Sequence, residues 1–235
     1  AARNHDGIED YDVQVLKLLY LMKNMKDIPS NQENIIVLMT DSIDTDRINL
    51  RRDIIASLER LISQNYVSRA GDAYCFLTDE EQEIQRGIKQ VSVPDSTTTK
   101  RIAEIIYGDI YTVKKFRHGN GEFAFDQFVD GQATGSVGSD MALRFLTLST
   151  DDTEKTDMRL RVDSQGGQAI VVLANTGYYQ AIEQAQQIKL YTKSKNVRQM
   201  SVQTQKIIEA QHDLADQYEA DAKAKLYEAI QKGEF

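Results

Sequence analysis

With 235 residues, the chain is long enough for one large domain or two small ones, each with its own core. A net charge of −8 and a pI near 5.0 argue against a protein that binds nucleic acid by bulk electrostatic attraction. The single cysteine, Cys75, excludes an internal disulfide and favours a reducing, cytoplasmic setting, and no apolar run approaches the roughly 20 residues that span a bilayer.

Residues 10 to 77 are predicted to form three helices followed by a two-stranded hairpin. Apolar residues of the first helix recur at spacings near three and four, which predicts one buried stripe. Its members are Val13, Leu16, Leu19, Tyr20 and Met22. The second helix is expected to begin at a capping box made by Ser30 and Glu33. Its apolar residues are Ile35, Ile36, Leu38 and Met39.

The third helix follows an acidic turn that starts at Asp41. Its apolar residues fall on one arc of a helical wheel, namely Ile48, Ile54, Ile55, Leu58, Leu61 and Ile62. The hairpin turns at Gly71-Asp72, and we expect its Cys75 to be buried or half-buried. A second capping box, Thr78 with Glu81, predicts a helix that runs to about Gln90. This order is typical of a winged helix-turn-helix, which either places a helix in DNA or packs against a protein partner.

The rest of the chain mixes strands and helices. Residues 91–99 are predicted to be a linker, followed by a short helix over 100–107 and strands over 141–148, 158–162 and 169–173. A helix is expected over 178–193. Residues 197–231 form one long helical pattern near heptad spacing without internal proline or glycine, which indicates a coiled-coil arm.

These elements predict an α+β protein with three parts. They are a winged-helix domain over 10–90, a mixed α/β domain over 100–195 and a long helix, interpreted as a truncated coiled coil, over 196–235. The polar stretch 1–7 resembles a trimmed linker, and the chain stops in or just after a helical pattern. We therefore expect an excised piece of a larger protein.

The predicted winged helix offers a candidate surface for DNA or a partner protein. Its residues are Arg47, Asn49, Arg51, Arg52, Arg60 and Arg69. The aspartates at 41, 44, 46 and 53 surround it and would repel phosphates. Residues 1–90 hold 11 lysines and arginines against 16 aspartates and glutamates, a net charge of −5. This balance favours a protein partner and leaves DNA as the alternative.

No catalytic, cofactor or metal site is predicted. The glycine-rich stretch 131–140 has no lysine after its glycines and does not match a P-loop, so a loop between two strands explains it better. The histidines at 5, 118 and 212 are scattered, and no Cys-x-x-Cys or His-x-x-His spacing supports a metal site. A nucleophile of the Gly-x-Ser-x-Gly type is absent from the sequence.

Four passages resemble a known family. They are LMTDSIDTDRINLR (38–51), GDAYCFLTDEEQEI (71–84), FAFDQFVDGQATGSVGSDMALRFLT (123–147) and YTKSKNVRQ (191–199). Over most of residues 10–210 the chain is similar to the region that follows the ATPase core in large P-loop proteins of BREX phage-exclusion systems, the BrxC/PglY type.

The resemblance implies a bacterial, cytoplasmic AAA+-like ATPase in defence against phage, with ATP and Mg²⁺ as its cofactors. It also implies a DNA methyltransferase and a phosphatase-like protein as partners. Walker A and Walker B patterns are missing here, so no ATP-binding residue is assigned and this piece is not expected to be an enzyme by itself. The leading hypothesis is an assembly region that docks partner proteins or sister subunits. The alternative is a DNA-binding winged helix.

Overall fold

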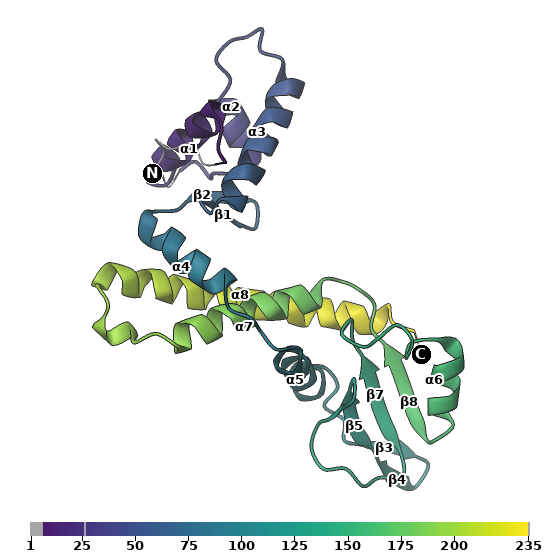
Figure 1. The fold of residues 1–235 in the computed structure, drawn as a ribbon. Coiled ribbons are helices and arrows are strands. Elements are labelled where there is room, and N and C mark those ends of the chain that lie inside the picture. The colour runs from purple at the N-terminus through teal and green to yellow at the C-terminus, as the bar shows by residue number, and fades with distance from the viewer. Residues whose placement is uncertain (1–6, 26, 235) are drawn as a thin grey trace. The chain divides into compact units, whose positions relative to one another are not determined.

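The computed structural model describes residues 7–25 and 27–234 (Figure 1). Positions 1–6, most of the stretch interpreted as a trimmed linker, lie outside the described residues. The chain divides between Gln90 and Val91 into two compact units, here called the N-terminal and the C-terminal unit. No helix of the described residues is long and apolar enough to cross a membrane.

The N-terminal unit consists of helices and one antiparallel hairpin. In chain order they are α1 (Asp10–Met22), α2 (Gln32–Leu38), α3 (Arg47–Ser63), β1 (Val67–Ala70), β2 (Ala73–Phe76) and α4 (Asp79–Lys89). The hairpin has a two-residue turn, Gly71-Asp72, between the paired residues Ala70 and Ala73. Gly71 has a φ of 59°, which glycine adopts without steric cost.

The first three helices and the hairpin share one apolar core. It is built from Ile8, Val15, Leu16, Leu19, Met22, Ile35, Ile36, Ile54, Leu58, Leu61, Val67 and Tyr74. For two residues that were predicted to lie on the apolar faces of their helices, the prediction is wrong. Tyr20 is 55% exposed, with its ring edge-on to Phe76 at 5.3 Å, and Ile48 is exposed at the start of α3. Cys75 is also exposed rather than buried or half-buried.

Of the two predicted capping boxes, the second is confirmed. Thr78 accepts from the backbone N–H of Glu81, whose carboxylate accepts from the N–H of Thr78. The first is wrong, because α2 is capped by Asn31, which accepts from the N–H of Asn34 at 2.9 Å. The carbonyl of Ser30 accepts instead from the backbone N–H of Tyr74, which ties the start of α2 to the hairpin.

A buried ion pair joins α1 to α3. Arg60 donates from Nε and Nη2 to the two oxygens of Asp12, at 2.9 and 2.7 Å. The side chain of Asp12 is 0% exposed and also accepts from the backbone N–H of Glu9. Burial works to raise the pKa of Asp12, but the hydrogen bonds from Arg60 and Glu9, with the charge of Arg60, hold it below its usual range.

The C-terminal unit contains strands and helices in mixed order. They are α5 (Asp95–Ile105), the π-helical turn Ile106–Ile110, β3 (Lys115–His118), β4 (Gly121–Ala124), β5 (Asp126–Val129), β6 (Gln132–Ala133), β7 (Ala142–Leu146), α6 (Asp157–Ser164), β8 (Gln168–Val172), α7 (Tyr178–Lys193), the 3₁₀ turn Val197–Gln199 and α8 (Val202–Gln231). The strand order is β6-β5-β7-β8, and β3 and β4 pair separately.

Three parallel strands present one apolar row to the helices. Val129, Phe145 and Val171 are register partners on β5, β7 and β8, so they lie on the same face of the sheet. Residues of α5, α7 and α8 cover this row, among them the fully buried Ile102, Tyr178 and Leu226. Figure 1 shows these helices beside the sheet and α6 along β8.

The glycine-rich stretch 131–140 connects β5, through β6, to β7. It is held by Asp126, whose carboxylate accepts from the backbone N–H groups of Gly138 and Ser139 at 2.9 and 3.1 Å. The hydrogen bond from Gly138, together with that from Ser139, lowers the pKa of Asp126. The stretch 131–140 is thus a loop between strands, and a side chain of β5 holds it by hydrogen bonds.

Three predictions differ from the structure of this unit. The expected linker is helical from Asp95 onward, because Pro94 occupies the N-cap position and Thr98 and Thr99 are buried. Residues 158–162 lie in α6 and not in a strand, since a helix must connect the parallel strands β7 and β8. The long helix α8 buries Ala215, Ala222 and Leu226 inside this unit and packs on α7, so it does not stand apart as an arm.

Replacing Arg60 by leucine is expected to destabilise the N-terminal unit by about 2 kcal/mol, because Asp12 would be buried without a partner. The value is below that of fully buried pairs because Arg60 is partly exposed. Hydrogen exchange of α1 and α3 amides measures this loss. Arg52→Leu is the control, since its pair with exposed Asp53 contributes less than about 1 kcal/mol. Equal effects of the two variants would contradict the prediction.

The pair also predicts a pH dependence. Because folding lowers the pKa of Asp12, its stabilisation is present above the unfolded value of about 3.9 and is lost as the pH falls through the folded pKa. Asp12→Asn lacks this titration. The urea midpoints of wild type and variant should differ near pH 7 and converge below about pH 4. A gap that stays constant over this range would show that the charge of Asp12 is not what stabilises the unit.

Candidate docking surface

Four large apolar side chains are exposed around the connection between α2 and α3. Ile43 is fully exposed, Ile48 is 83% exposed and Val37 is 65% exposed. Leu38 completes the group, which we call the docking surface. All four lie within twelve residues of chain, from the end of α2 to the first turn of α3.

The lengths of the two helices explain this exposure. Helix α2 has seven residues and buries Ile35 and Ile36, whereas Val37 and Leu38, which follow them, are exposed. Helix α3 buries side chains only from Ile54 onward. Its first turn therefore extends past the core and places Ile48 in solvent.

Local hydrogen bonds hold the connection between the helices. Asp46 caps α3 by accepting from the N–H groups of Ile48 and Asn49. The hydrogen bond from the Asn49 N–H, followed by that from Ile48, lowers the pKa of Asp46. Within the turn, Thr45 donates to Asp41 at 2.9 Å and accepts from the N–H of Ser42. The apolar side chains are thus presented on a defined backbone.

Four of the six predicted contact residues come together on the first turns of α3. Arg51 pairs with Glu33 at 2.7 Å, and Arg52 pairs with Asp53 at 3.1 Å. Asn49 donates to the cap residue Asp46 at 2.6 Å. Arg47 is exposed and makes no ion pair or hydrogen bond with the described residues. Most of the predicted positive surface is thus already neutralised within the unit.

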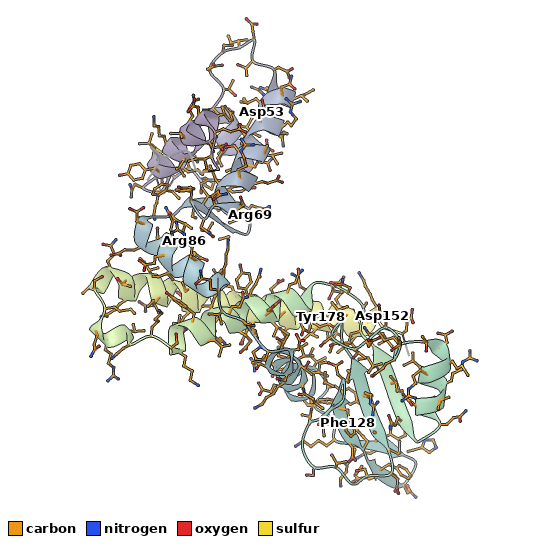
Figure 2. The ribbon with its side chains drawn as sticks, in the orientation of Figure 1. Asp53, Arg69, Arg86, Phe128, Asp152 and Tyr178 are labelled. Atoms are coloured by element: carbon orange, nitrogen blue, oxygen red, sulfur yellow. The ribbon has the colours of Figure 1, made fainter. Side chains whose placement is uncertain are left out.

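The other two predicted residues lie elsewhere. Arg60 faces α1, where it binds Asp12 and reaches Glu9 at 3.2 Å. Arg69 lies on the hairpin, donates to the carbonyl of Gly71 at 2.9 Å and stacks over Tyr74. Figure 2 labels Asp53 on α3 and Arg69 on the hairpin.

Sequence reasoning missed the docking surface. It placed Ile48 on the apolar arc of the third helix, named Leu38 only among the apolar residues of the second helix, and gave Val37 and Ile43 no role. One signal was available, since a helix of seven residues cannot bury every side chain of the continuous apolar run from Ile35 to Met39. Ile43, an isolated isoleucine in an acidic turn, is a second signal.

The C-terminal unit has a cavity of about 700 Å³ between α6 and β8. Its lining is largely apolar and includes Tyr111, Leu160, Ile170 and Ile230, with Asp157 and Arg161 among its polar residues. No group of three or more histidine, cysteine, aspartate or glutamate residues in the described chain could hold a metal ion.

A family model described as "BREX ATP-binding protein BrxC 4th domain with six-stranded beta sheet" matches residues 91–235. This range is the C-terminal unit, in whose described residues 91–234 the strands β3 to β8 form a four-stranded sheet and a separate hairpin. No solved structure shows a significant match to the chain. Because the match covers more than half of the chain, this protein belongs to the BrxC family of BREX ATP-binding proteins, and it contains the fourth domain of that family.

Proposed function

We propose that this chain is an assembly region of a BREX phage-defence ATPase, and that its N-terminal unit is a winged-helix module that binds a protein partner. The partners we propose are sister subunits, the methyltransferase or the phosphatase-like protein of the same cytoplasmic system. The order of three helices and a hairpin supports the winged-helix interpretation. So does the bridge between Asn31 and Ala73, which pairs the start of α2 with the hairpin.

The docking surface is the observation that carries this proposal. A helix that reads DNA presents polar and basic side chains to base edges and phosphates. Here the connection into α3 exposes Ile43 and Ile48, and Val37 is exposed near the end of α2. Burying such side chains against a partner gains about 25 cal/mol per Å² of apolar surface, whereas DNA offers little apolar surface in return.

Electrostatics supports the same choice. Each phosphate contact needs a cation that is free to release a counterion. Arg51, Arg52 and Arg60 are paired with carboxylates of the same unit, and the unit as a whole has a net charge of −5. Breaking these pairs would offset part of any gain from phosphates.

The chemistry of the family is proposed to lie outside this chain. The fourth domain is a region outside the ATPase core. We propose that ATP and Mg²⁺ bind elsewhere in the full-length protein and that this region transmits or anchors their effect through contacts. DNA binding by the winged helix is the second candidate, and exposed Arg47 is the observation that favours it.

The variant Ile43→Asp/Ile48→Asp is expected to lower affinity for the partner by about tenfold or more, because it places two charges in an apolar interface. Biolayer interferometry with the purified methyltransferase and phosphatase-like protein, and light scattering of the chain alone, measure the three pairings. The fold should be unchanged, since both side chains are exposed.

Met158→Asp/Val202→Asp is the matched control, because these side chains are 80% and 71% exposed in the other unit. It should bind as the wild type does. If the wild-type chain forms none of the three complexes, or if both double variants weaken it equally, the docking surface is not the interface.

The chain is expected not to bind duplex DNA through its winged helix. Fluorescence anisotropy with a labelled duplex across a salt series checks this, with Arg47→Glu and Arg51→Glu as variants. Affinity near micromolar that falls steeply with salt and is lost in both variants would establish the DNA-binding alternative.

A further inference from the structure

The hairpin of β3 and β4 is exposed at nearly every residue. Every residue of β3 is exposed, and the hairpin pairs with no other strand of the described chain. Figure 1 shows it beyond the ends of β5 and β7. An isolated two-stranded hairpin is marginally stable in water. Its exposed side chains add little to a hydrophobic core, so we consider a binding role for them.

Aromatic side chains gather on one face of this hairpin. Phe116 and Phe123 are direct register partners, and they are 51% and 46% exposed. His118 lies two residues along from Phe116, with the rings parallel within 10° at 6.3 Å. A Cβ at Gly121 would approach the ring of Phe123 to 3.0 Å, so glycine leaves room for that ring beside it. The result is an exposed platform of ring faces.

Positive charge lies on the opposite face of the hairpin, at Lys115 and Arg117, and just before β3, at Lys114. Residues 112–125 contain three lysines and arginines against one glutamate, a net charge of +2 in a chain of −8. Lys115 and Arg117 share the single carboxylate of Glu122, at 3.2 and 2.8 Å, and Arg117 remains 79% exposed. Lys114 is exposed and makes no ion pair within the described residues. Cationic charge therefore exceeds what the hairpin itself neutralises.

We propose that the β3–β4 hairpin binds single-stranded nucleic acid, with bases stacked on Phe116 and Phe123 and with phosphates reached around the edge of the two-stranded hairpin by the long side chains of Lys114, Lys115 and Arg117. Ring faces stack on bases of any sequence, and neighbouring cations contact the backbone. Duplex bases are already stacked on each other and cannot use the platform. An apolar protein surface would use the rings but not the three cations, so the charge favours the nucleic acid.

The absence of tryptophan from the sequence gives a direct test. Phe116→Trp adds one fluorophore to the platform of the full chain. Addition of the oligonucleotide dT20 should quench its emission, with the midpoint measured by anisotropy of labelled dT20. Met158→Trp places the same fluorophore on α6, where 80% exposure gives access but no platform, and its emission should not change.

A second pair of variants separates stacking from simple apolar contact. Phe116→Leu/Phe123→Leu keeps an apolar face without rings and should weaken dT20 binding about tenfold or more. Lys114→Ala should reduce the slope of log affinity against log salt by about 0.7, the value for one phosphate contact on a single strand. Lys206→Ala, an exposed lysine at the start of α8, should leave the slope unchanged, and so should Arg47→Ala in the N-terminal unit.

Three results would overturn the proposal. They are failure to bind dT20 at low salt, binding that survives Phe116→Leu/Phe123→Leu, and tighter binding of a duplex of the same length. Self-association of the chain that is lost in Phe116→Asp/Phe123→Asp but kept in the leucine variant would assign the platform to a protein contact instead. Circular dichroism of each variant confirms that the fold is retained.

Discussion

The ion pair between Arg60 and Asp12 sets how the N-terminal unit presents α3. The buried carboxylate of Asp12 caps α1 by accepting from the N–H of Glu9, and it links α1 to α3 by accepting from Arg60 near the end of α3. One end of α3 is therefore fixed to α1. Since α3 has 17 residues and its fully buried side chains begin at Ile54, its other end contacts the core only through the partly buried Leu50. The exposed Ile48 and Arg47 follow from where this helix is anchored.

In the C-terminal unit, the buried apolar row of the sheet decides which elements are packed and which are exposed. The row of Val129, Phe145 and Val171 buries one face of the parallel sheet under α5, α7 and α8. Tyr107 adds a polar contact, since its hydroxyl lies 3.0 Å from the carbonyl of Phe128 and 2.8 Å from that of Leu143. The β3–β4 hairpin precedes β5 and takes no part in this row. Its aromatic rings are exposed, and no residue of β3 or β4 belongs to the core of this unit.

Periodicity predicted the elements that depend on local sequence. The helix over 178–193 and the capping box of Thr78 and Glu81 agree with the structure, since both arise from residues close together in the chain. Residues 158–162 were misassigned because alternation over five residues cannot reveal that β7 and β8 are parallel and need a crossover. Arg60 was placed on the exposed face because the burial of Asp12, 48 residues away, cannot be seen in a helical wheel. The candidate surface lost part of its free charge for the same reason, because the pairing of Arg51 with Glu33, 18 residues away, depends on tertiary structure.

The acidic composition of the chain acts differently on the two exposed surfaces. Apolar docking through Ile43 and Ile48 depends on buried area and is little affected by net charge, so an acidic unit can bind a protein while repelling DNA. For the β3–β4 hairpin, the same acidity restricts where nucleic acid can approach. In our proposal, a single strand that is repelled over most of a chain of charge −8 would be held where local charge is positive and aromatic rings are exposed. Because the two surfaces belong to separate units, substitution of one leaves the core that supports the other intact. The proposed protein docking and the proposed nucleic acid binding can therefore be tested one at a time in a single chain.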